Sequence, residues 1–286
     1  MADPTTTILR LTAFTDTPDG GNPAGVVLDA AALTDAQMQR IAADVGYSET
    51  AFVTNTTNNT VRYFSPLAEV PFCGHATIAT AVALAERDGP GELLLVTQAG
   101  PVAVTTGRDG DGGAITATLT SVSPAVESAE DEDVDAALAA LRWSFDDLDP
   151  DLPPRIAYAG ARHLVLAART RERLADLDYD FEALKAYMSA RDLTTLALVH
   201  RDAGDPALFH ARNPFPVGGV VEDPATGAAA AAFGAYLRAL GLVDPPATIA
   251  IHQGDDLGRP SRLTVAIDPD PASGIRVSGG AVRIPA

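Results

Sequence analysis

Two alanine-rich runs without a charged residue constrain the fold of this chain most. They extend from His75 to Ala85 and from Ala228 to Leu237, and the first charges beyond them are Glu86 and Arg238. A helix that is apolar all round must be enclosed by the rest of the protein. Alanine has the highest helix propensity, and its small side chain lets a sheet wrap closely around a helix. We therefore expect two buried central helices, and packing alone accounts for their alanines.

The elements around these helices follow the same order in both halves of the chain. Alternating and helical patterns predict strands at 8–14, 25–28, 50–54 and 61–64, a hairpin at 93–98 and 102–106, and a helix at 34–45 capped by Thr34 and stopped by Gly46. The second half repeats this order, with helices at 133–141 and 180–190 and strands at 161–167, 195–200 and 208–212. The acidic stretch 121–135 is expected to be a linker. It divides the chain into domains 1–122 and 123–286, and the last strand is able to return to the first half.

Composition excludes several classes of function. The formal net charge is −18, so Lys and Arg clusters that would neutralise nucleic acid or an anionic membrane are absent. No apolar run approaches the roughly 20 residues that cross a bilayer, and the expected location is the cytoplasm. Cys73 is the only cysteine, which excludes an internal disulfide, a cysteine metal cluster and a CxxC redox pair. The histidines show no HxxxH or HxH spacing, so no metal site is expected.

The residues just before each alanine run are the first candidates for a functional site. Pro71 to Thr77 and Glu222 to Ala228 stand where the unpaired N–H groups and positive dipole end of a helix collect. Such an end receives a carboxylate or an enolate-like charge. Capping alone explains either segment by itself. Their repetition in both halves favours a shared site.

Glu49 is a third candidate, because it stands between a helix stop and an apolar strand. A lone glutamate there can be a solvated surface residue. A glutamate turned inward among Phe52, Phe64 and Phe72 would instead be a competent proton shuttle. The residues alone leave both readings open.

Six sequence blocks resemble the PhzF-like family of phenazine biosynthesis, and they occur in the family's order over nearly the whole chain. They are Ala13 to Val26, Ser48 to Phe52, Arg62 to Pro66, Pro71 to Thr77, Glu222 to Gly227, and Gln253 to Ser261. The resemblance implies an α+β fold similar to diaminopimelate epimerase. In that fold two pseudo-symmetric halves, each a curled mixed sheet around a central α-helix, enclose a cleft that holds the site.

The resemblance also assigns roles to residues of this chain. It implies that Glu49 is the acid/base of a proton-transferring isomerase and that His75 and Asp223 orient the substrate and relay protons. Pocket positions implied in the same way are Asn22, Ser48, Cys73, Gly74, Thr226, Gly227 and Ala228. The expected substrate is a small anion, a carboxylic acid such as the cyclohexadiene acid of the phenazine enzyme. No cofactor or metal, no nucleic acid and no membrane is expected as a partner, and relatives suggest a homodimer.

Two residues limit what the resemblance implies. Family members commonly carry serine at the position of Ala228, so the phenazine substrate is in doubt and a non-catalytic binding protein or retired enzyme remains the alternative. Epimerases of the same fold use two thiols, and a chain with Cys73 alone cannot. Cys73 is then either an apolar filler or a pocket-lining residue. Arg62 and Arg212 are left with two readings, substrate carboxylate binding or structural ion pairing.

Overall fold

The chain folds into two compact units in a computed structural model that describes residues 6–108 and 113–285. The first unit is Met1–Thr120 together with Ser278–Ala286, and the second is Ser121–Val277. The expected ranges were 1–122 and 123–286, with the last strand free to return to the first half. Among the residues described, none of the helices combines the length and apolar character needed to cross a bilayer.

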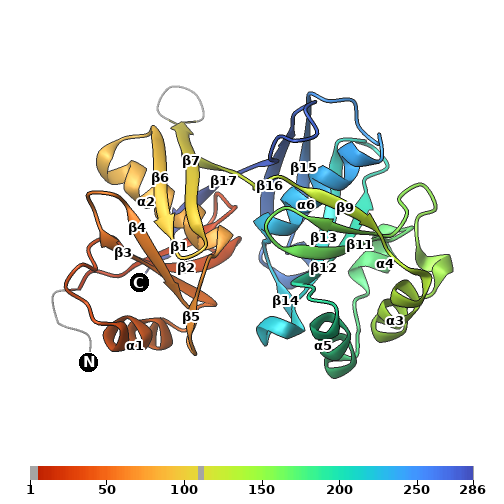
Figure 1. Cartoon of the computed structure of the whole chain (residues 1–286), viewed down its shortest axis with the longest axis horizontal. Helices are drawn as coiled ribbons and strands as arrows, with labels where there is room; N and C mark the ends of the chain where they lie inside the picture. Colours follow the sequence, from red (N-terminus) through yellow and green to blue (C-terminus); the bar gives the residue numbers. More distant parts are fainter. Residues whose placement is uncertain (1–5, 109–112, 286) are drawn as a thin grey trace. The chain divides into compact units, whose positions relative to one another are not determined.

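The strands of the first unit pair in a closed ring around one helix (Figure 1, red to yellow, with β17 in blue). In ring order, the pairings join β1, β2, β3, β4, β6, β7, β8 and β17, and β17 returns to β1. The bounds are β1 Leu9–Ala13, β2 Asn22–Val27, α1 Asp35–Val45, β3 Glu49–Asn55, β4 Thr60–Phe64, β5 Glu69–Val70, α2 Gly74–Asp88, β6 Glu92–Thr97, β7 Gly100–Arg108, β8 Ile115–Thr120 and β17 Arg276–Arg283. Helix α2 contacts β1, β2, β3, β7 and β8, so the sheet encloses it.

The second unit repeats this order around α6. Strands β9 to β13, β15 and β16 pair in sequence, with β11–β12 and β13–β15 parallel as β2–β3 and β4–β6 are in the first unit. The bounds are β9 Ala125–Ser128, α3 Asp131–Leu141, β10 Arg155–Tyr158, β11 Arg162–Ala167, α4 Arg171–Ala175, α5 Phe181–Ala190, β12 Thr195–Arg201, β13 Leu208–Pro214, β14 Glu222–Asp223, α6 Gly227–Ala239, β15 Ala247–Gln253 and β16 Ser261–Ile267, with 3-10 turns at Phe145–Asp147, Pro216–Gly218 and Asp255–Leu257. Helix α6 contacts β9 to β12 and β16.

Both central helices are buried along their alanine runs, as predicted. Every residue from His75 to Ala85 of α2 is buried, and so is every residue from Ala229 to Leu237 of α6. Gly234 shows how closely the sheet approaches, because a Cβ added there would lie 2.8 Å from a methyl group of Val265. Small residues are therefore a packing requirement of these helices.

The prediction of a linker over 121–135 was wrong in part. Residues Ala125–Ser128 form β9, which pairs with β10, and α3 begins at Asp131 rather than near 133. The acidic residues that suggested a linker, Asp131, Glu132 and Asp133, occupy the first turn of α3. Negative side chains at a helix N-terminus are stabilised by the helix dipole. A run of acidic residues at this place therefore indicates a helix start.

Candidate active site

Glu49, Cys73 and His75 come together in the first unit, although they lie on different elements. Oε2 of Glu49 is 3.4 Å from Nε2 of His75 and 3.4 Å from Sγ of Cys73. The same sulfur is 3.4 Å from Nδ1 of His75 and 3.8 Å from its Nε2. The side chain of Glu49 is 18% exposed and that of His75 is 7% exposed. Glu49 is therefore an inward-facing carboxylate in contact with an imidazole and a thiol.

Local backbone geometry places these three side chains. Gly46 ends α1 in the left-handed conformation (φ 72°), and Glu49 then opens β3. Cys73 is the N-cap residue of α2, and its carbonyl accepts a 2.7 Å hydrogen bond from the hydroxyl of Thr77. His75 follows as the second residue of the helix. The carboxylate thus faces the first turn of α2.

Two further predicted pocket residues contact the imidazole. Nδ2 of Asn22 lies 3.1 Å from Nδ1 of His75, and Oγ of Ser48 lies 3.4 Å from Nε2. Asn22 is buried and follows Gly21, whose φ is 67° and whose added Cβ would lie 2.3 Å from the carbonyl oxygen of Ala13. Only glycine fits that turn. Both ring nitrogens of His75 are thereby held by polar neighbours.

The first turn of α6 carries a different arrangement in the second unit. Thr226 donates a 2.5 Å hydrogen bond from its hydroxyl to Oδ2 of Asp223. Gln253 fixes both residues: its Oε1 accepts from the Thr226 N–H at 3.1 Å, and its Nε2 donates to the Asp223 carbonyl at 2.7 Å. Gly227 and Ala228 are partly exposed. The sequence places Gln253 in one of the family blocks, but it does not predict that this side chain supports Asp223.

The short hairpin before each central helix has the same register in both units. Glu69 of β5 and Glu222 of β14 each pair with the last residue of the preceding strand. Helices α2 and α6 then begin five residues later. His75 and Ala228 are consequently equivalent positions, each the second residue of its helix.

Glu49 also has an equivalent in the second unit. Glu49 and Thr195 are the first residues of β3 and β12, and in each case the residue three further on faces the arginine of the next strand. The Thr195 hydroxyl lies 2.8 Å from Nδ1 of His163 and accepts a hydrogen bond from Asn213 at 3.0 Å. Burial lowers the pKa of His163 to about 4, so its imidazole is neutral at pH 7. Thr195 and Ala228 thus stand where the first unit has Glu49 and His75. Among the described residues, a carboxylate and an imidazole occupy these equivalent positions only in the first unit.

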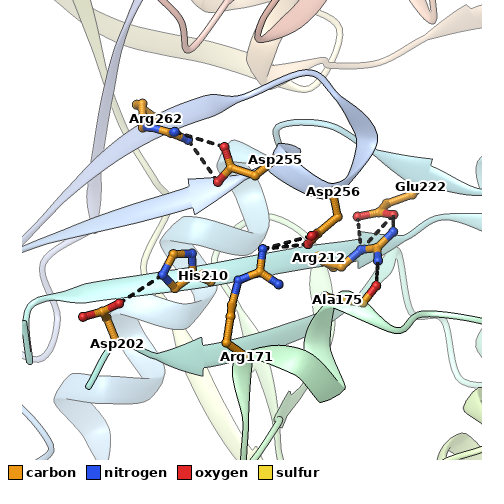
Figure 2. Close-up of polar contacts among 9 residues, drawn as sticks. All are labelled: Arg171, Ala175, Asp202, His210, Arg212, Glu222, Asp255, Asp256 and Arg262. Atoms are coloured by element: carbon orange, nitrogen blue, oxygen red, sulfur yellow. Dashed lines mark hydrogen bonds and ion pairs between the residues drawn. The ribbon is translucent and has the colours of Figure 1, made fainter. Parts of the chain in front are cut away.

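The arginines form structural ion pairs in both units. Arg62 makes two 2.7 Å hydrogen bonds to the carboxylate of Glu69 and also binds Asp35, which lowers the pKa of that aspartate. Figure 2 shows Arg212 held between Glu222 and the carbonyl oxygen of Ala175. The Glu222 side chain is only 1% exposed. Of the two readings for these arginines, the structure supports ion pairing.

Cys73 is not a simple apolar filler. It is partly buried, and its sulfur meets the carboxylate of Glu49 and the ring of His75. In the first unit the structure thus brings together Asn22, Ser48, Glu49, Cys73, Gly74 and His75; in the second it brings together Asp223, Thr226, Gly227 and Ala228.

Comparison with known proteins identifies relatives along the whole chain. A family model described as phenazine biosynthesis-like protein (PhzC-PhzF) matches residues 11–285. A trans-2,3-dihydro-3-hydroxyanthranilate isomerase from Pseudomonas chlororaphis is 34% identical over 275 residues, covering 94% of this chain and 94% of the relative. A PhzF-family protein from Bacillus anthracis superposes with a TM-score of 0.88 at 27% identity, covering 98% of this chain and 97% of that one.

A more distant structure bears on the fold alone. A hydroxyproline epimerase from Agrobacterium vitis superposes with a TM-score of 0.64 at 14% identity, covering 96% of this chain and 90% of the epimerase. Together with the likeness to the Bacillus protein, this confirms the predicted α+β, diaminopimelate epimerase-like fold.

Proposed function

The chain belongs to the phenazine biosynthesis-like PhzC-PhzF family and is an isomerase, and from that premise we propose that it moves one proton on a small carboxylic acid with Glu49 as its single acid/base. His75 and Asp223 support the transfer. The proposal rests on one observation above all, the 3.4 Å contacts of the Glu49 carboxylate with His75 and Cys73.

The chemistry follows from the surroundings of Glu49. A carboxylate takes a proton from one carbon of the substrate and, as the acid, returns it to another. His75 holds the carboxylate and, through Nε2, exchanges protons with it. The first turn of α2 offers unpaired backbone N–H groups next to Gly74, which stabilise the negative charge that develops on the substrate. This sequence of steps calls on no group outside the chain and its substrate, which is why we propose a cofactor-independent reaction.

Asp223 is proposed to bind or orient the substrate. Thr226 and Gln253 fix its carboxylate and its carbonyl, so its position is determined before any substrate arrives. The first turn of α6, with Gly227 and Ala228, supplies a second set of unpaired N–H groups. A carboxylic acid substrate suits such helix ends, which offset locally the repulsion expected from a net charge of −18.

The relative from Pseudomonas chlororaphis is named for its action on trans-2,3-dihydro-3-hydroxyanthranilate. We propose that the substrate here is of the same class, a small unsaturated or cyclic carboxylic acid. Ala228 in place of the family serine removes one hydroxyl from the proposed pocket, so the substrate is expected to differ in the group that this hydroxyl would contact. The cytoplasmic location and the homodimer both remain predictions. Measuring the molecular mass of the protein in solution tests the homodimer.

A non-catalytic binding protein is the less favoured function. A Glu49 on the outer surface, with no closed pocket near His75, would favour that function, whereas the Glu49 side chain is only 18% exposed and contacts His75 and Cys73. A retired enzyme would have no reason to retain that carboxylate in contact with both groups.

The test is the turnover of trans-2,3-dihydro-3-hydroxyanthranilate and related acids by the unsubstituted chain and by Glu49→Gln. Losing general acid/base catalysis should lower kcat by about 10²–10⁴-fold. The melting temperature should stay close to that of the parent, because glutamine keeps the shape of the side chain. A variant that retains the parent's kcat would overturn the assignment of Glu49.

A further inference from the structure

The residues around His75 select one tautomer of its ring. Nδ2 of Asn22 donates a 3.1 Å hydrogen bond to Nδ1 of His75. An amide nitrogen donates and does not accept, so Nδ1 carries a lone pair and the proton of the neutral ring stands on Nε2. We propose that Asn22 is a positioning residue of the isomerase, which keeps the Nε2–H side of His75 toward Glu49. This role rests on the proposed function of Glu49, and it differs from the pocket position that the resemblance implies for Asn22.

The opposite side of the ring specifies the same tautomer. Nε2 of His75 lies 3.4 Å from Oε2 of Glu49 and 3.4 Å from Oγ of Ser48. An ionised carboxylate accepts hydrogen bonds and donates none. A lone pair on Nε2 would therefore be repelled by the carboxylate, whereas an N–H there is attracted to it. A donor beside Nδ1 and an acceptor beside Nε2 agree on where the proton stands.

The backbone on both sides of Asn22 holds its amide in place. Gly21 precedes it in a turn that only glycine fits, and Pro23 follows it, which restricts the residue before a proline to extended conformations. Asn22 pairs with Ala13 of the neighbouring strand β1 and is only 2% exposed. The amide is thus directed at His75 before any substrate arrives.

The second unit lacks both the imidazole and the amide. Ala228 stands at the position equivalent to that of His75. The first residue of β3 and the first residue of β12 each pair with a parallel strand, and two places before the paired residue the chain has Asn22 in the first unit and Ala161 in the second. Among the described residues, the amide therefore occurs at this position only in the unit that has a ring to orient.

The fixed tautomer determines which group meets the substrate as a base. The lone pair of the ring is on Nδ1 and is taken up by Asn22, so it does not compete for the proton of the substrate. Nε2–H offers a proton to the side of the ring on which the Glu49 carboxylate lies. In the resting site His75 is thus a donor and Glu49 is the acceptor, which is the division of roles that a single acid/base requires.

Nitrogen-15 NMR of the imidazole rings shows the tautomer without any substrate. The full chain is labelled with ¹⁵N-histidine and measured at about pH 8.5, where an imidazole is ordinarily neutral. Comparison with His75→Gln identifies the signals of His75. We expect Nε2 to have the chemical shift of a protonated nitrogen and Nδ1 that of an unprotonated one. A parent chain with the proton on Nδ1 overturns the proposal.

Asn22→Asp keeps the shape of the side chain and replaces the donor with an acceptor. Nδ1 of His75 should then become protonated, and the ring either becomes a cation or loses the proton on Nε2. Both changes weaken Glu49 as a base, because a cation stabilises its carboxylate and a lone pair on Nε2 favours its protonated form. A catalytic histidine in the wrong tautomer loses up to about 10⁴-fold in kcat in the serine-protease triad, so kcat should fall here by about 10²-fold or more.

The Michaelis constant distinguishes this role from substrate binding. A positioning residue leaves KM nearly unchanged while kcat falls, because it acts on the reacting groups and not on the bound substrate. A raised KM with the parent's kcat in Asn22→Asp would mean that Asn22 contacts the substrate, and would overturn the proposal.

Asn22→Ala keeps the proposal testable where a buried carboxylate unfolds the chain. It removes the donor without adding a charge, so the two tautomers should interconvert and both ring nitrogens of His75 should show intermediate chemical shifts. Asn213→Asp is the matched control, because Asn213 is equally buried, at 1% exposed, and donates to Thr195 in the second unit. It should leave the signals of His75 unchanged, and circular dichroism establishes that each variant is folded. An Asn22→Ala variant with the parent's His75 signals would overturn the proposal.

The tautomer and the turnover are measured separately, so their failures are distinguishable. Asn22 variants that change the tautomer of His75 but keep the parent's kcat would overturn the positioning role and leave Glu49 as the acid/base. A chain that holds Nε2–H through Asn22 but turns over no substrate would contradict the proposed function, while the assignment of the tautomer to Asn22 would stand.

Discussion

His75 and Ala228 occupy the same position in the two units, each as the second residue of the central helix. The two units share their strand order, their parallel pairings and the register of the hairpin before the helix. Their chemistry is not shared, because Glu49 and His75 in one unit correspond to Thr195 and Ala228 in the other. A chain with one cysteine and one such glutamate cannot use matched groups from both repeats, which favours a single acid/base.

Ala228→Ser tests what the missing hydroxyl does. The side chain stands partly exposed in the first turn of α6, so a serine fits without burying its hydroxyl. A hydrogen bond from it to a charged substrate is worth about 1.5–3 kcal/mol, so kcat/KM for trans-2,3-dihydro-3-hydroxyanthranilate should rise about tenfold or more. Ala228→Gly, which adds no hydroxyl, should not raise it. Equal values for the serine variant and the parent would contradict this role.

The equivalent ion pairs of the two units should differ in their contribution to stability. Glu222→Gln leaves Arg212 buried without its carboxylate and should cost about 3–5 kcal/mol of unfolding free energy. Glu69→Gln removes the equivalent carboxylate, but Arg62 and Glu69 are 26% and 27% exposed and Arg62 keeps Asp35. Its cost should be about 1 kcal/mol. Urea unfolding measures both, and a larger loss for Glu69→Gln would contradict the ranking by burial.

Gln253→Ala should impair catalysis through Asp223. The variant loses the hydrogen bonds that fix Thr226 and the Asp223 carbonyl, at a stability cost of about 1–3 kcal/mol. Tyr236→Phe is the control, because it removes a single hydrogen bond to Pro153 in the same unit. Assayed well below both melting temperatures, Gln253→Ala should lower kcat/KM and the control should not. Parallel losses in both variants would mean that Gln253 acts on stability alone.

His163 should make the protein less stable in mild acid. Its folded pKa of about 4 lies below the usual 6.5, so the unfolded chain binds the proton first and stability falls as the pH drops below 6.5. Between about pH 7.5 and about pH 5 the loss from this group should be about 2 kcal/mol, and it should level off below pH 4. His163→Gln should remove that part of the pH dependence. Unchanged urea midpoints of the parent across this range would contradict it.

Local signals predicted the helices better than the strands. The cap at Thr34 and the stop at Gly46 identified α1, because both act through neighbouring residues. The two central helices followed from their lack of charge. Strand β9 and the hairpin strands β5 and β14 were not predicted, since each depends on a partner strand that the local pattern does not reveal.

For the candidate site as well, the sequence identified residues but not the contacts that depend on distant parts of the chain. Family blocks identified Glu49, His75 and Asp223 as candidates, but their contacts depend on how β3 meets α2 in the first unit and on how Gln253 of β15 meets Asp223 in the second. Nothing in the pattern around Cys73 showed that its sulfur would meet a carboxylate. Gln253, from a strand 30 residues beyond Asp223, is a support that only the folded chain reveals.

Solvent-deuterium incorporation tests the role of Glu49 most directly. The parent chain, turning over substrate in deuterium oxide, should give product that carries deuterium at the carbon that receives the proton. Glu49→Gln should give essentially none over the same time, while Glu69→Gln, which alters a glutamate of the same unit outside the site, should match the parent. Undiminished incorporation by a folded Glu49→Gln variant would contradict the account.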